Sequence, residues 1–351
     1  MKRQLESSSL DFTKLFQIAN VIVSLGIIMV TGGGSWDITN HILNKPETFF
    51  APPHAILYSG VGIALLGFIL LLITWKKIGM PQKFRKGVKI AGIGIGLLLA
   101  AGPADFAWHS RFGLDGLLSP PHLVLISGMA LSAIGALVTT RVLVSESETP
   151  RRFTIIISMI PIWLSITGLF YSFSLPFSKT DYFDYNPNPI FAAGFASVAY
   201  PFLISVILVS SSLFAKNRFG VASIVGASYL GIMTFSAIIP NHVLEQTIPF
   251  YWTNLIPIVL GDYILSRAKN TKGVMVAGAI FGCAFYFLYY PLITYTYNKI
   301  MLDKLMWPSL TSQIYFEMTP IIAPFLIAVG GVVGAIATRF AQKITARPSL
   351  G

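Results

Sequence analysis

The sequence predicts an all-α polytopic membrane protein of about ten transmembrane helices, arranged as five hairpins with both termini in the cytoplasm. The first observation is composition: 54% of the 351 residues are hydrophobic and only 11% are charged, whereas soluble domains carry about 25% charged residues. The second is a series of apolar runs, each about 20 residues long, which is the length that crosses a bilayer. The third is the placement of lysine and arginine between these runs. The lipid bilayer is therefore the first predicted partner.

The apolar run 15–34 follows a polar N-terminal segment and contains no small-residue cleavage site. It leads directly into the polar residues around Asp37, so we interpret it as a retained first span and not as a removed signal peptide. Nine further runs have the length of a membrane helix. The ten predicted spans are 15–34, 54–75, 88–108, 121–142, 153–175, 190–214, 220–240, 248–266, 273–296 and 318–340.

The basic residues predict the orientation of these spans. If the N-terminus is cytoplasmic, 20 of the 25 lysines and arginines fall in the tails and loops on that side and 5 on the other. This bias fits the positive-inside rule and predicts a multi-pass protein of the cell membrane. The net charge of +11 is then explained by topology, and no nucleic-acid partner is expected. The predicted external loops are 35–53, 109–120, 176–189, 241–247 and 297–317.

Small residues recur at short spacings in three spans, as GIGIG at 92–96, GAIFG at 278–282 and GGVVG at 330–334. Such spacings let helix backbones approach each other closely in a membrane. They predict tight helix packing, and nothing around them indicates a phosphate site.

The first predicted hairpin repeats in the second at an offset of 68 residues. Between 34–60 and 102–128, nine of 27 positions are identical, and the shared residues are mostly polar. Membrane composition alone would favour shared Leu, Ile and Gly, so agreement at Asp, His and Pro indicates an inherited local geometry. The sequence therefore predicts two regions: 1–145 with the duplicated hairpins, and 146–351 with six further spans. The matched polar residues are Asp37 with Asp105, His41 with His109, Glu47 with Asp115, and His54 with His122.

Spacing predicts that the repeated residues form metal sites on the external side. Asp37 and His41 are four residues apart, so they share one face of a helix. His54 follows two prolines at the predicted start of the returning helix, and the intervening loop brings it back beside the first pair. Two imidazoles and a carboxylate with open coordination positions suit copper, iron or zinc. The predicted metal ligands are Asp37, His41, His54, Asp105, His109 and His122.

Four other residues are candidates for supporting roles. Glu47 and Asp115 occupy matched loop positions and are predicted to accept hydrogen bonds from the ligands or to relay protons. His242 and Glu245 lie three residues apart in the predicted loop 241–247, where they are candidates for a third site, a gate or a relay. The sequence does not identify any catalytic residue.

The run Asp-x3-His-x12-His, with proline before the last histidine, resembles the copper-binding segment of the C subunit of particulate methane and ammonia monooxygenases. The resemblance covers about twenty residues in each copy, from Asp37 to His54 and from Asp105 to His122. It implies a copper-dependent membrane monooxygenase, or a subunit of one, that acts with other membrane subunits on a small uncharged substrate such as ammonia or a short alkane. That subunit has fewer than ten spans.

Three alternatives stay open at the level of sequence. A zinc-dependent membrane hydrolase needs the same three ligands and an activated water. A transporter or metal-handling protein would bind its cargo transiently, but transporters usually carry polar groups at mid-membrane in several helices. Here such groups gather at one surface, which favours a fixed external site. The last alternative is a scaffold whose Asp and His side chains only connect helices.

Overall fold

A computed structural model describes residues 2–43, 45, 48–113, 115–145, 152–174, 189–284 and 319–346. All regular elements within these ranges are helical. Nine of the described helical segments are long and apolar enough to cross a membrane, and Thr271–Ala284 is a shorter apolar helix. The predicted all-α membrane fold is therefore confirmed. The helices are α1 (Lys2–Ile42), α2 (Pro52–Lys77), α3 (Gln82–Phe112), α4 (Pro120–Ser145), α5 (Arg152–Ser174), α6 (Pro189–Phe214), α7 (Val221–Met233), α8 (Ile248–Thr253), α9 (Leu255–Arg267), α10 (Thr271–Ala284) and α13 (Thr319–Thr345).

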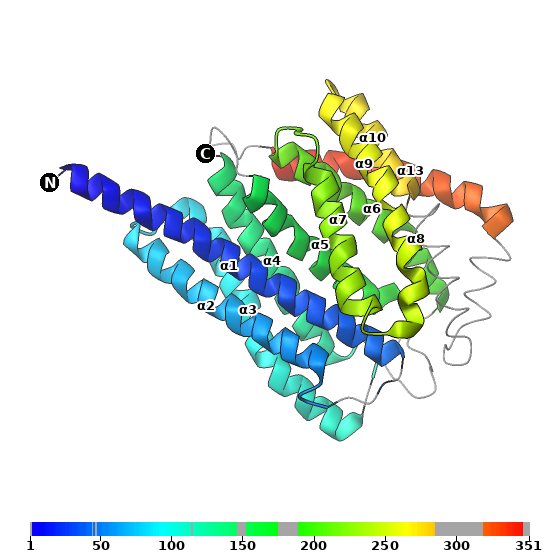
Figure 1. Cartoon of the computed structure of the whole chain (residues 1–351), viewed down its shortest axis with the longest axis horizontal. Helices are drawn as coiled ribbons and strands as arrows, with labels where there is room; N and C mark the ends of the chain where they lie inside the picture. Colours follow the sequence, from blue (N-terminus) through cyan, green and yellow to red (C-terminus); the bar gives the residue numbers. More distant parts are fainter. Residues whose placement is uncertain are drawn as a thin grey trace.

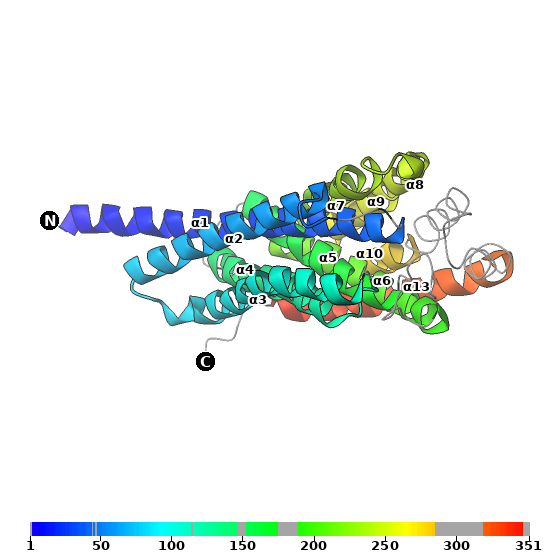
Figure 2. The ribbon, with the colours of Figure 1, turned by 90° about the horizontal axis from the view of Figure 1, so that it is seen from below.

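The helices run alongside one another in an elongated bundle (Figures 1 and 2). α1 pairs with α2 and α3 with α4, and these two hairpins have the most extensive contacts in the described chain. In Figure 2, α1 begins at the left, and α13 runs from the right towards the left, so the start of α1 and the end of α13 point to the same side. The assignment of that side to the cytoplasm stays a prediction from the basic residues.

The four helices of the first two hairpins have the boundaries that the site requires. α1 and α3 extend beyond the predicted spans to Ile42 and Phe112, so each carries its Asp-x3-His pair within regular helix. Gly113 directly follows α3, and its φ of 78° is a backbone conformation that glycine adopts at little cost. α2 and α4 begin at the proline pairs, because the first N–H groups of a helix need no partner within it.

Glycines let the paired helices approach closely. A Cβ on Gly26 of α1 would overlap the backbone of Ala64 in α2, and a Cβ on Gly94 of α3 would overlap Ser132 in α4. Each member of the second pair lies 68 residues after its counterpart in the first. In the second half of the chain, a Cβ on Gly282 of α10 would overlap the carbonyl oxygen of Gly330 in α13. Tight packing of helices at these small residues is what their spacing predicts.

Polar side chains inside the bundle fix the relative position of α1, α4 and α5. Asn20 of α1 donates from Nδ2 to the Ala136 carbonyl at 3.2 Å and to Thr140 Oγ1 at 2.9 Å, both in α4. Thr140 in turn shares a hydrogen bond of 2.7 Å with Ser158 of α5. Buried polar groups are costly unless they are paired, so these bonds favour one register of the three helices over its alternatives.

Irregular backbone follows α7 in the second half of the chain. A π-helical turn, Thr234–Ile238, leads into the 3₁₀ helix His242–Thr247 and then into α8 and α9. The buried Asp262 of α9 accepts hydrogen bonds from the backbone N–H groups of Gly220 and Ser223, each at 2.9 Å. A carboxylate at a helix N-terminus satisfies donors that lack partners within the helix, so Asp262 caps α7.

Candidate metal centre

The second hairpin brings three potential metal ligands together. Nε2 of His109 lies 3.3 Å from Nε2 of His122, and each of these nitrogens lies 3.4 Å from Oδ1 of Asp105. The three donor atoms therefore form a nearly equilateral triangle. Asp105 and His109 come from the last turns of α3, and His122 comes from the first turn of α4. The prediction that these three side chains converge is confirmed.

The opposite nitrogen of each imidazole is held by the backbone. His109 Nδ1 lies 2.8 Å from the Gly113 carbonyl oxygen, and His122 Nδ1 lies 3.1 Å from that of Gly116. A carbonyl oxygen only accepts hydrogen bonds, so Nδ1 carries the proton in both rings. In the neutral imidazoles, Nε2 is then an unprotonated acceptor. With both rings neutral, two nitrogen lone pairs and a carboxylate oxygen face one another, and either a metal ion or a proton on one Nε2 makes that arrangement favourable.

The distances between the three donor atoms match those around a tetrahedral ion of the size of zinc. Donors placed tetrahedrally at about 2.0–2.1 Å from zinc, or from an ion of similar size, are about 3.3–3.4 Å apart. Oδ1 of Asp105 is buried and accepts no regular hydrogen bond from the described residues. The triangle leaves one side open for a further ligand, because the side chains of Asp105 and His109 are 21% and 18% exposed.

The first hairpin has the same components in a wider arrangement. Nε2 of His54 lies 3.0 Å from Oδ1 of Asp37, whereas Nδ1 of His41 lies 4.0 Å from Oδ2 of the same carboxylate. His54 Nδ1 lies 2.9 Å from the Thr48 carbonyl oxygen, six residues earlier, as His122 Nδ1 does with Gly116. Asp37 therefore contacts both of its predicted partners, but among the described residues only Asp105, His109 and His122 have donor atoms that all lie within 4.8 Å of one another.

The two hairpins also bring their histidines to one place. The His41 ring centre lies 5.8 Å from that of His122 and 6.1 Å from that of His109. The register set by Asn20 and Thr140 explains this proximity. At 1.5 Å per residue, His41 lies about 31 Å along α1 from Asn20, and His122 lies about 27 Å along α4 from Thr140. α1 and α4 run in opposite directions, so both histidines reach a similar height in the bundle.

Asp115 lies where a supporting residue is expected. Its Oδ1 is 3.4 Å from His122 Nδ1, its Oδ2 accepts a hydrogen bond from Trp108 Nε1, and the residue is only 4% exposed. Ser119, which no pattern in the sequence indicates, also contacts His122 Nδ1, at 2.9 Å. These groups hold the ring from the side opposite the triangle, as outer residues commonly do around ligating histidines. Glu47, predicted for the matching role, lies outside the described residues.

His242 and Glu245 pair with each other on the protein surface. Their ion-pair atoms are 2.7 Å apart, and their side chains are 86% and 48% exposed. Neither residue belongs to the group of ligand atoms that lie within 4.8 Å of one another around Asp105. Their assignment as relay residues stays a prediction.

Aromatic side chains surround the outer part of the first hairpin. Phe49 contacts Tyr58 and Phe106, with ring centres 5.1 and 5.0 Å apart, and Tyr58 lies 5.9 Å from the ring of His54. Phe106 is the residue directly after Asp105, and it is 53% exposed. Apolar surface therefore connects the two hairpins beside their ligands.

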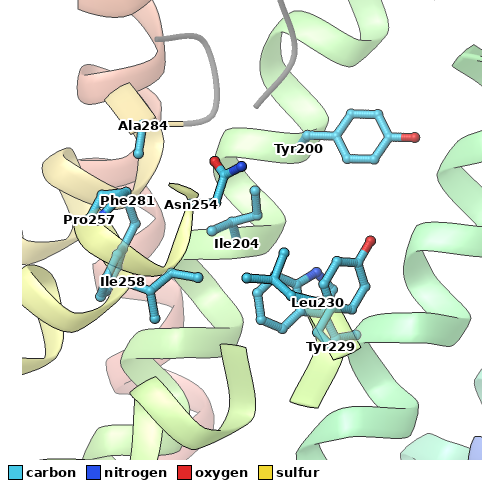
Figure 3. A pocket seen from close by; sticks show the side chains of 10 residues that line it. Tyr200, Ile204, Tyr229, Leu230, Asn254, Pro257, Ile258, Phe281 and Ala284 are labelled. Carbon is cyan, nitrogen blue, oxygen red and sulfur yellow. The ribbon is translucent and has the colours of Figure 1, made fainter. Parts of the chain in front are cut away.

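A separate cavity lies in the second half of the chain (Figure 3). Its wall includes Trp163, which stacks on Tyr229 with ring centres 4.2 Å apart, and Tyr200, whose hydroxyl bonds to Ser174 at 2.9 Å. Its lining residues come from α5, α6, α7, α9 and α10 and from Asn254. These residues are scattered along the sequence, and no spacing in it predicts the cavity.

No protein-family model, no curated protein and no solved structure matches this chain.

Proposed function

We propose that this protein is an integral membrane metalloprotein that binds copper at Asp105, His109 and His122, and that it acts as a copper-dependent monooxygenase or as a subunit of one. The proposal extends the resemblance of its Asp-x3-His-x12-His runs to the C subunit of particulate methane and ammonia monooxygenases. Two findings support it: the chain has apolar helices that could span a membrane, and Asp105, His109 and His122 form a possible metal-binding triad.

One observation carries the proposal: the mutual approach of Asp105 Oδ1, His109 Nε2 and His122 Nε2 to 3.3–3.4 Å. A purely structural polar cluster pairs donors with acceptors. This cluster turns the N–H group of each neutral imidazole towards a backbone carbonyl, so that three acceptors face one another unless one Nε2 is protonated. A resident cation removes the conflict, and a set of two imidazoles and one carboxylate selects transition metals over magnesium or calcium.

Matching contacts in the two hairpins support a duplicated metal-binding unit. The helix approach of Gly26 to Ala64 recurs as that of Gly94 to Ser132. The contact of His54 with the carbonyl six residues before it recurs at His122. Selection for packing alone would preserve the glycines, but it would not preserve the orientation of the last histidine. The recurrence therefore supports retention of a ligand geometry in both copies.

The surroundings suit oxidation of a small apolar or uncharged substrate. A monooxygenase reaction inserts one oxygen atom of O₂ into the substrate and reduces the other to water with two electrons and two protons. In this chain the open side of the triangle faces partly exposed surface, and exposed Phe106 places apolar surface directly beside Asp105. A quinol-class reductant and partner subunits would supply the electrons.

Metal analysis of protein purified in detergent or nanodiscs tests the proposal. The wild type, His109→Ala and the control His242→Ala are loaded with Cu(II), freed of excess metal, and compared by elemental analysis and EPR. We expect stoichiometric copper with nitrogen hyperfine structure in the wild type and in His242→Ala, and loss of this species in His109→Ala. Equal trace copper in all three proteins would overturn the metal assignment. Copper binding without O₂ consumption in the presence of a quinol and a short alkane or ammonia, with the partner subunits present, would overturn the oxygenase assignment.

Zinc-dependent hydrolysis is the second candidate, because the triangle has the spacing of a tetrahedral site with one open position. Purification from cells grown with balanced copper, iron and zinc distinguishes the two. Zinc as the retained metal, together with retention of that zinc against excess Cu(I), would favour the hydrolase.

A further inference from the structure

Seven ionisable side chains of the two hairpins gather at one end of the bundle. Asp37, Asp105 and Asp115 contribute carboxylates that are 13%, 21% and 5% exposed. Asp37 and Asp105 are close enough to interact electrostatically with each other, and Asp37 also interacts with His122 of the other hairpin. The four remaining members are His41, His54, His109 and His122.

A single metal ion held by Asp105, His109 and His122 would not contact every carboxylate of this cluster. Three ionised carboxylates carry three negative charges, and their ion-pair contacts within the described chain are with histidines. Buried charges that are not compensated are costly. An ion held by Asp105, His109 and His122 reduces the charge, but it leaves Asp37 facing the imidazoles of His41 and His54.

His41 lies between the two sets of ligands. It is 2% exposed, it lies 4.0 Å from Asp37, and its ring is about as far from His122 as from His109, at 5.8 and 6.1 Å. Two imidazoles on one tetrahedral ion place their ring centres a little over 5 Å apart, as His109 and His122 do at 5.1 Å. The ring of His41 is therefore close enough to share a centre with the second hairpin, while it still contacts the carboxylate of the first.

We propose that the two hairpins form one dinuclear centre, in which a second metal ion is held by Asp37, His54 and His41 next to the ion of Asp105, His109 and His122. This inference rests on the proposed metal-binding function of the second hairpin. The two ions of such centres are typically about 3.5–4 Å apart. His41, between the two ligand sets, couples them, and both hairpins are then required for a single site.

The competing arrangement is an imidazolium of His54 paired with Asp37. The 3.0 Å separation of His54 Nε2 and Asp37 Oδ1 suits such a hydrogen bond, and it needs no second metal. The two arrangements differ in metal stoichiometry and in the magnetic behaviour of the bound ions.

Cu(II) titration of the full-length protein in nanodiscs distinguishes them. The bound copper is counted by elemental analysis, and the EPR intensity is integrated in the wild type, His54→Ala and His242→Ala. We expect two equivalents of copper in the wild type, with fewer than two unpaired spins per chain because adjacent ions couple. His54→Ala should bind one equivalent with one full spin, and His242→Ala should behave as the wild type.

Each other outcome has one meaning. One equivalent with a full spin in both wild type and His54→Ala overturns the dinuclear centre and leaves the proposed function intact. Two equivalents with two independent signals overturn the shared centre and favour separate sites. No retained copper in the wild type overturns the proposed function itself. Asp37→Asn, which keeps the side-chain volume, repeats the test without removing a buried ring.

Discussion

The two hairpins share their ligands but hold them differently. In the second, the three predicted ligand atoms are within 3.3–3.4 Å of one another, whereas in the first the two histidines lie 3.0 and 4.0 Å from the aspartate. The loop of the second hairpin closes on its own histidines through Gly113, Gly116 and Ser119. The comparison shows that identical ligand spacing does not by itself set the compactness of a site.

Three substitutions between the copies explain the difference. Gly113, which follows α3 with a positive φ, accepts the His109 hydrogen bond through its carbonyl oxygen. The matching residue is Lys45, which instead donates to Asn241, directly before the 3₁₀ helix His242–Thr247. Ser119, which contacts His122, is matched by Ala51. Trp108, which donates to Asp115, is matched by Asn40. The second loop is therefore tied to its own ligands, and the first is tied to another part of the chain.

The largest expected contrast comes from replacing the matched aspartates. Asp105→Asn removes the charged ligand of the compact triangle. We therefore expect copper affinity at that site to fall more than about 100-fold, which is more than the usual loss when a residue that only supports a ligand is replaced. Asp37→Asn should lower the affinity of that same site by a smaller factor. Competition titration with a copper chelator measures both. Equal losses in the two variants would contradict the difference between the hairpins.

Trp108→Phe should weaken the compact triangle by about 10- to 100-fold in copper affinity, the usual effect of removing a supporting partner. The substitution removes the hydrogen bond to Asp115 and keeps an aromatic ring. Trp36→Phe, directly before Asp37, is the matched control and should leave the second site unchanged. The same chelator competition reports both variants, and unchanged affinity in Trp108→Phe would mean that Asp115 does not orient His122.

Gly94→Ala should destabilise the protein by about 1–3 kcal/mol, because inserting a methyl group into a tightly packed interface forces the helices apart. The added Cβ would overlap Ser132 of α4, whereas a Cβ on Gly96 has open space around it. Gly96→Ala is therefore the control, and thermal unfolding in detergent compares the two. If the two hairpins pack alike, Gly26→Ala should lower the stability by as much as Gly94→Ala. A clearly smaller loss of stability in Gly26→Ala would show that the first hairpin packs less tightly than the second.

The smallest effect is expected at the serine that distinguishes the two loops. Ser119→Ala should lower copper affinity at the second hairpin by up to about 10-fold, since Gly116 still holds His122 Nδ1 and one supporting bond is lost. The reciprocal Ala51→Ser should tighten the first hairpin by a similar factor. Isothermal titration with copper checks both directions. If copper affinity falls in Ser119→Ala but does not rise in Ala51→Ser, then Lys45, and not residue 51, keeps the ligands of the first hairpin apart.

Much of the site is readable from the sequence because its constraints are local. The four-residue spacing within α3 places Asp105 and His109 on one face, and proline at a helix start fixes where His122 returns. The residues that hold the ligands in place are harder to predict from the sequence. Asp115 is identifiable from its matched position, but the contact of Ser119 and the carbonyl anchors at Gly113 and Gly116 depend on loop conformation.

The sequence by itself determined the membrane helices, the two ligand sets and the hairpins that carry them, because hydrophobic length and helical periodicity act over a few residues or one span. Only the tertiary structure decided that His41 of the first hairpin lies beside His109 and His122 of the second. That proximity depends on the register of α1 against α4, which buried bonds such as Asn20 to Thr140 set more than 100 residues apart. Interactions over such separations leave no periodic pattern along the chain, so they become visible only when the helices are packed.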